Sequence, residues 1–174
     1  DEGEYAYAAQ LLLHGESFYK HAYNTALKLP GTVGAYAAIM AASGQTPAAL
    51  HCGVILVDLA SAWLLFLLTK RFFGDTAGVI AAGTFILLST TPTINGFAAH
   101  ATHFVVLPML AGTILLQNLG RRTSSFRVFL AGFFVGLAVL MKQTAVPFGL
   151  FATSWILWQE FQADKKWSRA GGRA

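Results

Sequence analysis

One apolar segment, residues 47–69, constrains the fold of this chain more than any other feature. It reads PAALHCGVILVDLASAWLLFLLT and is followed at once by Lys70 and Arg71. A helix needs about 20 mainly apolar residues to cross the hydrocarbon core of a bilayer, and this segment supplies them. The chain as a whole has 11% charged residues and a mean hydropathy of +0.55. Soluble domains usually contain about 25% charged residues, so the composition favours a membrane protein.

Two further apolar segments have the length and composition of membrane helices. Residues 76–91 are expected to form a second span that ends before Pro92. Residues 98–119 are expected to form a third span, which Pro108 would kink, as membrane helices tolerate. Together with residues 47–69 they predict an all-α, polytopic membrane helical bundle.

The apolar region 128–158 is too long for one span and too short for two full ones. We interpret it as two short helices, 128–141 and 146–158, broken at MKQTAVP, and one long tilted helix is the alternative. The positive-inside rule favours the broken form, because it brings all three basic clusters to the cytoplasmic side. These clusters are Lys70-Arg71, Arg121-Arg122-Arg127 and Lys165-Lys166-Arg169.

The same rule places residues 1–46 outside the membrane and the basic tail, residues 161–174, in the cytoplasm. The outer segment is expected to contain two interfacial helices. The first begins with EYAYAAQLLLHG, whose apolar residues have helical spacing, and ends at Gly15; the second covers GTVGAYAAIMAASG. All five tyrosines of the chain fall in this segment, which suits rings at the level of the lipid headgroups.

Several charged residues gather at the outer end of this arrangement. Three lysines break the positive-inside pattern, two histidines lie at the outer end of the third span, and three carboxylates open the chain: Lys20, Lys28, Lys142, His100, His103, Asp1, Glu2 and Glu4. Cations can hold a phosphate while a carboxylate acts as a base. The pattern therefore predicts a site for an anionic, lipid-linked molecule.

Plain structural roles compete with this interpretation. Lys20 and Lys28 can be solvated loop charges, whereas a lysine such as Lys142 between apolar helices is costly and usually has a partner. His100 and His103 share a helix face and are weak candidates for a metal, because two ligands do not make a metal site. Asp58, inside the first span, is expected to pair with a polar group on a neighbouring helix.

The composition also excludes other classes of protein. The single cysteine, Cys52, excludes a disulfide framework and a cysteine-based zinc site. No nucleic-acid-binding motif is present, and the basic residues are too dispersed to follow a phosphate backbone, so nucleic acid is not an expected partner.

Five motifs in register resemble one family. They are the opening DEGEYAYAAQLLLHGESFY, the turn and helix LKLPGTVGAYAAIMAASG, the span end LLTKRFFGDTAG, the polar end INGFAAHATHF and the broken pair GLAVLMKQTAVPF. Their order and spacing resemble membrane glycosyltransferases of the GT-C superfamily. Within it, the closest likeness is to glycosyltransferase family 39, the protein O-mannosyltransferase and aminoarabinose-transferase-like group.

The resemblance implies an inverting transfer of a sugar from a polyprenyl-phosphate donor to a lipid, glycan or protein acceptor on the outer face. It matches Asp1 to the family's catalytic aspartate and Glu2 to its acidic companion. It matches Lys28 to a phosphate-contacting lysine, although Lys-Leu-Pro replaces the usual Lys-Pro-Pro. His100 stands where members often carry arginine, and Lys142 matches a lysine of the short hairpin.

The same resemblance implies an integral protein of a bacterial inner membrane, surrounded by membrane lipids. Lys28, together with His100 or a divalent metal ion, would stabilise the leaving phosphate. One more helix is expected before Asp1, and further helices and a soluble domain after residue 174, so this segment by itself is not expected to be active. A transporter or flippase of lipid-linked sugars is the alternative, but it should carry polar residues through the midplane of several helices.

Overall fold

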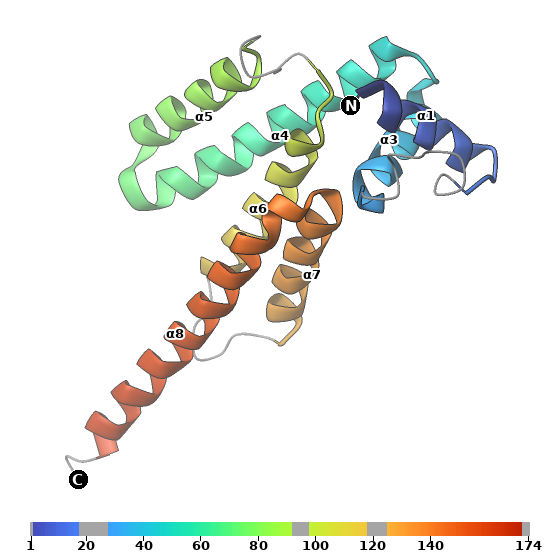
Figure 1. Ribbon diagram of the computed structural model, residues 1–174. Helices are drawn as coiled ribbons and strands as arrows, with labels where there is room; N and C mark the ends of the chain where they lie inside the picture. Colours follow the sequence, from blue (N-terminus) through green and yellow to red (C-terminus); the bar gives the residue numbers. More distant parts are fainter. Residues whose placement is uncertain (1, 18–27, 92–97, 118–124, 172–174) are drawn as a thin grey trace.

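The computed structural model describes residues 2–17, 28–91, 98–117 and 125–171, and every regular element within them is a helix (Figure 1). The predicted all-α class is therefore confirmed. The helices are α1 (Glu2–Leu13), α3 (Pro30–Ser43), α4 (Pro47–Phe73), α5 (Asp75–Ser89), α6 (Ala101–Gln117), α7 (Ser125–Met141), the 3₁₀ helix η3 (Gln143–Ala145) and α8 (Val146–Gly171).

Within the described residues, one helix, α4, is long and apolar enough to cross a membrane, with a mean hydropathy of 2.1. Its large apolar side chains, such as Ile55, Leu56 and Trp63, are exposed on this chain. An apolar surface of this kind needs lipid or other helices around it. Helices α5, α6 and α7 are apolar but shorter. A bundle with several spans therefore stays a prediction.

Local signals in the sequence define the hairpin of α4 and α5. Thr46 caps the start of α4, where its Oγ1 accepts a hydrogen bond from the Ala49 N–H at 3.2 Å. Gly74 ends the helix with a φ of 88°, a left-handed conformation that glycine adopts without strain, and its N–H donates to the Lys70 carbonyl. Helix α5 begins at the next residue, and Lys70 Nζ lies 2.7 Å from Asp75 Oδ1 across the turn.

The helical conformation is interrupted between α7 and α8 at Lys142, whose backbone is extended with φ −158° and ψ 136°. The region is therefore not one continuous helix. The expected end of the second helix near residue 158 is wrong, because α8 continues to Gly171 and takes up most of the basic tail. The physical reason lies in the sequence, since residues 150–169 contain neither glycine nor proline to stop a helix.

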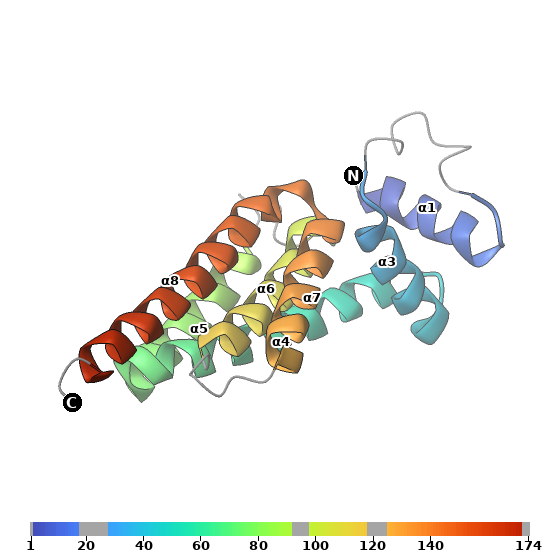
Figure 2. The same cartoon turned by 90° about the horizontal axis from the view of Figure 1, so that it is seen from below.

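In Figure 2 the helices extend between two opposite sides of the molecule. The α4–α5 turn and the end of α8 lie toward one side, although Figure 1 shows them well apart from each other. Helices α1 and α3, the start of α6 and the α7–α8 break lie at the other, which we call the site end.

The best-buried core lies at the site end, between α1, α3, α4 and the start of α6. Tyr36 is fully buried there, and its ring centroid lies 5.7 Å from that of Tyr5 and 5.7 Å from that of Phe104. Tyr5 and Tyr36 therefore pack inside the protein rather than against lipid, and their depth relative to the lipid headgroups stays a prediction. Tyr7 is exposed, and the remaining two tyrosines lie outside the described residues.

Candidate functional site

The site end brings together residues from four separate parts of the chain. Glu2 lies on α1, Lys28 precedes α3, His100 precedes α6, and Lys142 occupies the break between α7 and α8. Asp1 and Lys20 lie outside the described residues. The contacts below describe how the other candidates are arranged.

The two carboxylates of the first helical turn reach different neighbours, because residues two apart do not share a helix face. Glu2 Oε1 lies 2.8 Å from His51 Nε2 on α4, and Glu2 Oε2 accepts a hydrogen bond from the Ala99 N–H at 3.2 Å. Glu2 therefore links α1 to α4 and to the segment that carries His100. The contact with His51 was not predicted from the sequence, where the two residues are far apart.

Glu4 is the partner of Lys28. Lys28 Nζ donates to Glu4 Oε2 at 2.5 Å and lies 4.4 Å from the centroid of the Tyr5 ring. The other oxygen of Glu4 is buried and has no hydrogen-bond partner within the described residues. The loop lysine is thus held against α1 rather than extended into solvent, with a side chain that is 18% exposed.

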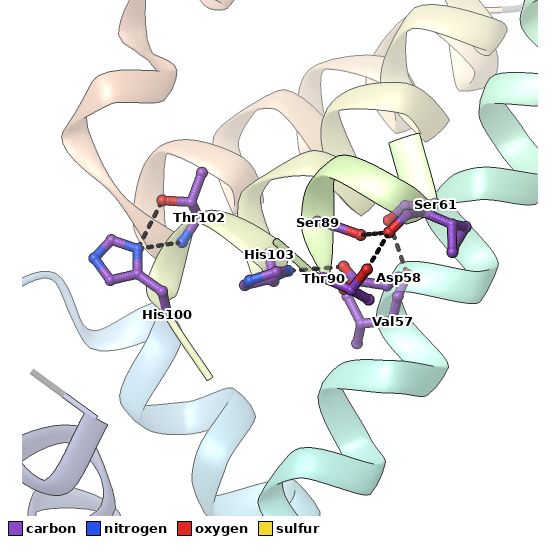
Figure 3. A network of polar contacts seen from close by, with 9 residues as sticks. Val57, Asp58, Ser61, Ser89, Thr90, His100, Thr102 and His103 are labelled. Carbon is purple, nitrogen blue, oxygen red and sulfur yellow. Dashed lines mark hydrogen bonds and ion pairs between the residues drawn. The ribbon is translucent and has the colours of Figure 1, made fainter. Parts of the chain in front are cut away.

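A short chain of hydrogen bonds joins Lys142 to His100 through Thr102. Lys142 Nζ donates to Thr102 Oγ1 at 3.2 Å, and that hydroxyl lies 2.8 Å from His100 Nδ1, as Figure 3 shows for His100 and Thr102. The Thr102 N–H also approaches His100 Nδ1, at 3.4 Å. These contacts make Nδ1 the acceptor and leave the proton of the neutral ring on Nε2. Thr102 had no signal in the sequence that marked it as part of the site.

Lys28, His100 and Lys142 form what we call the cation cluster. Burial lowers the pKa of His100 below its usual range, and the positive charge of Lys142 lowers it further. His103 and Lys28 act on the pKa of His100 in the same direction. The three predicted phosphate ligands therefore lie close enough to influence one another electrostatically.

Helix α3 fixes the positions of these groups relative to one another. Thr32 Oγ1 donates to the Met141 carbonyl at 2.8 Å, next to Lys142. Tyr36 donates its hydroxyl to the carbonyl of Ala99, next to His100. Burial raises the pKa of Tyr36, as does the negative charge of Glu2, so this phenol keeps its proton and its bond. One helix thus holds both the α7–α8 break and the segment before α6.

His103 is turned away from the cation cluster toward α4. Its Nδ1 lies 2.9 Å from Asp58 Oδ1, and both side chains are nearly buried (Figure 3). The expected pairing of Asp58 with a polar group on a neighbouring helix is confirmed. Within the described part of the chain, no group of three His, Cys, Asp or Glu residues could hold a metal ion, so His100 and His103 do not form such a site there.

Comparisons with known proteins give one result at the level of the family. The family model described as dolichyl-phosphate-mannose-protein mannosyltransferase matches residues 23–171, a range that contains all three members of the cation cluster and follows the acidic opening. Neither the comparison with curated proteins nor the comparison with solved structures found a match. The chain belongs to the dolichyl-phosphate-mannose-protein mannosyltransferase family, a family of membrane glycosyltransferases of the GT-C type.

Proposed function

We propose that this protein transfers a sugar, with inversion, from a polyprenyl-phosphate donor to a hydroxyl group on the outer face of a bacterial inner membrane. The observation that carries the proposal is that Lys28 and Lys142 lie close enough to His100 to lower its pKa, while Glu2 accepts a hydrogen bond from the residue before His100. These residues come from four segments of the chain, next to the apolar core that α1, α3, α4 and the start of α6 form. Charged groups at such a place in a membrane protein usually serve function.

The cation cluster suits the phosphate of a lipid-linked sugar. Such a donor carries one negative charge on a phosphodiester, and further charge develops on the phosphate oxygen as the bond to the anomeric carbon breaks. The ammonium groups of Lys28 and Lys142 and the Nε2–H of His100 are donors that can stabilise this charge. Thr102 holds Lys142 and His100 side by side, so both can reach the same phosphate.

Asp1 is assigned the role of general base and Glu2 the role of its companion. The acceptor oxygen attacks the anomeric carbon from the side opposite the phosphate, its proton passes to the carboxylate of Asp1, and the electron pair of the broken bond leaves with the polyprenyl phosphate. One carboxylate oxygen of Glu2 lies 2.8 Å from His51 Nε2, and the other accepts a hydrogen bond from the Ala99 N–H. That arrangement suits a group that orients the site beside the base.

The arrangement of charges supports an outer-face site. Lys70 and Arg71 lie at the α4–α5 turn, at the end of the molecule opposite the cation cluster (Figure 2). The positive-inside rule assigns that turn to the cytoplasm. The site end then faces the outer leaflet.

A transfer assay on the full-length protein in membrane vesicles of known orientation tests this proposal. Radiolabelled polyprenyl-phosphate mannose is the donor, and loss of label from the lipid fraction is measured. We expect the wild type to release label at the outer face, and Asp1→Asn to lose about 10²–10⁴-fold in rate, as expected on removing a general base. Full activity of Asp1→Asn contradicts the assigned base. Movement of intact donor between leaflets without cleavage supports a flippase instead.

A further inference from the structure

Asp58 and His103 form a buried polar pair that the proposed mechanism does not use. His103 Nδ1 lies 2.9 Å from Asp58 Oδ1, and the side chains of His103 and Asp58 are 10% and 9% exposed. The pair joins α4, which is long and apolar enough to cross a membrane, to the first turn of α6. Ionisable groups at such a place are costly and usually serve function.

Stability alone is a weak reason for such a pair. A buried ion pair loses the hydration of both partners, and apolar residues of similar volume often stabilise a protein equally well or better. Ser61, one turn after Asp58, shows a simpler way to bury a polar group, because its hydroxyl donates to the Val57 carbonyl of its own helix at 2.8 Å. The Asp58–His103 contact instead reaches a second helix, so it specifies how α4 and α6 face each other.

This contact fixes the rotation of α6 about its own axis. Successive residues of a helix are about 100° apart, so the direction of His103 also determines the direction of Thr102. Figure 3 shows the ring of His103 extended toward Asp58, with Thr102 and His100 together on the other side of it. Thr102 contacts both His100 and Lys142. A change in the direction of His103 would therefore move the hydroxyl that joins these two groups.

His103 is also tied directly to His100. Its N–H donates to the His100 carbonyl at 3.1 Å in the first turn of α6. After burial and Lys142, His103 is the next influence that lowers the pKa of His100. Phe104, the following residue, packs on Tyr36 of α3, with ring centroids 5.7 Å apart. The first turn of α6 is thus held from α4 by the polar pair and from α3 by the aromatic contact.

We propose that Asp58 and His103 are positioning residues, whose contact holds α6 in the rotation that the donor site requires. Through Thr102, this rotation keeps the Nε2–H of His100 and the ammonium group of Lys142 side by side, where both can reach one phosphate. The inference rests on the proposed function and adds two residues that act through α6 rather than by contact with the donor.

Three variants separate the position of α6 from the charge and the stability of the pair. Asp58→Asn removes the negative charge but keeps an oxygen that can accept the Nδ1–H of His103. Asp58→Val with His103→Leu removes both polar groups and leaves no unpaired charge, so the fold should remain as stable as in the wild type. Asp58→Glu keeps the charge, moves the carboxylate by one methylene group, and carries the test if the double variant does not fold. Ser61→Ala is the matched control, because the buried hydroxyl that it removes contacts only its own helix among the described residues.

The measurements are the melting temperature, the donor KM of the full-length enzyme and the nitrogen NMR signals of isotope-labelled histidine. The signal of His100, assigned by its loss in His100→Gln, reports which ring nitrogen carries the proton and needs no turnover. We expect the double variant to keep its melting temperature, to raise the donor KM about threefold to tenfold, as for the loss of one hydrogen bond, and to populate both tautomers of His100. Asp58→Glu should raise the donor KM about threefold, whereas Asp58→Asn and Ser61→Ala should stay within about twofold of the wild type.

An unchanged donor KM and a single His100 tautomer in both the double variant and Asp58→Glu would show that the pair only joins α4 to α6, and the inference fails. An equal rise of the donor KM in Asp58→Asn and in the double variant would assign the effect to the negative charge, which also contradicts positioning through the hydrogen bond. If the wild type releases no label from the donor, the proposed function fails instead. The tautomer of His100 then still decides whether the pair positions the ring.

Discussion

At the scale of single residues, His100 is the member of the cation cluster that gains a positive charge when the pH falls. The usual pKa of histidine is about 6.5. Burial and the neighbouring Lys142 lower the pKa of His100 below that value, so the ring is uncharged at pH 7. A fall in pH through the lowered pKa adds a positive charge beside the proposed phosphate, and a bound phosphate in turn favours the protonated ring.

We therefore expect the donor KM to fall as the pH is lowered from 7.5 to values below the usual histidine pKa of about 6.5. One added charge near a partly exposed phosphate contributes about 1 kcal/mol, which corresponds to about a fivefold change in affinity. Steady-state donor titrations across this range measure the effect. His100→Gln keeps an N–H donor but cannot gain charge, so its donor KM should not vary with pH in this way. The same slope in wild type and His100→Gln would assign the dependence to another group.

The sequence identified single residues where their surroundings made them unusual. Lys142 was conspicuous because a lysine rarely lies between apolar segments, and Lys28 because it precedes Pro30 in an outer segment. Glu4 and Thr102 were not identified as their partners, since helical periodicity relates only residues three or four positions apart. The Lys28–Glu4 and Lys142–Thr102 contacts join segments that come together only in the folded chain.

At the scale of helices, Gly31 sets the distance between α3 and the end of α7. A Cβ on Gly31 would lie 2.5 Å from the carbonyl oxygen of Leu140 and 2.8 Å from the nitrogen of Met141. Both are backbone atoms, which cannot turn aside as a flexible side chain can. Since Lys28 lies just before α3 and Lys142 just after α7, this close approach also sets the separation of the two lysines.

Gly31→Ala should therefore push α3 away from α7 and weaken donor binding. Forced overpacking typically costs about 1–3 kcal/mol, and we expect a lower melting temperature together with a raised donor KM. Gly34→Ala is the matched control on the same helix, because a Cβ there meets nothing within 4 Å. Thermal unfolding and donor titration of both variants provide the measurement. Equal values for the two would show that the close approach does not position the site.

The predicted break at Lys142 separates α7 from α8. The first span was expected to end at residue 69, but α4 continues through Lys70 and Arg71 to Phe73 and ends at Gly74. The predicted end of α8 near residue 158 is wrong because a change from apolar to basic residues does not by itself end a helix. A helix that leaves an apolar environment can continue through polar residues as long as its backbone hydrogen bonds remain intact, and residues 150–169 contain nothing to break them.

At the scale of the whole molecule, the fold separates two groups of cations. The cation cluster lies at the site end, on the same side of the molecule as α1 and α3, and Lys70 and Arg71 lie at the α4–α5 turn on the opposite side (Figure 2). The sequence predicted this separation from the alternation of apolar segments and basic clusters. It could not predict that α3 would tie together the two segments that carry His100 and Lys142, because that depends on how the helices pack.

The most direct test of the account compares two lysines that are alike in charge but lie at opposite ends of the molecule. Lys142 contacts Thr102 within the cation cluster, whereas Lys70 pairs with Asp75 at the far turn. The measurement is the KM of the full-length enzyme for polyprenyl-phosphate mannose. We predict that Lys142→Ala raises it at least about tenfold, as for the loss of a charge-assisted hydrogen bond to phosphate, and that Lys70→Ala leaves it unchanged. An unchanged donor KM in Lys142→Ala, or equal increases in both variants, would contradict a phosphate site at this end of the molecule.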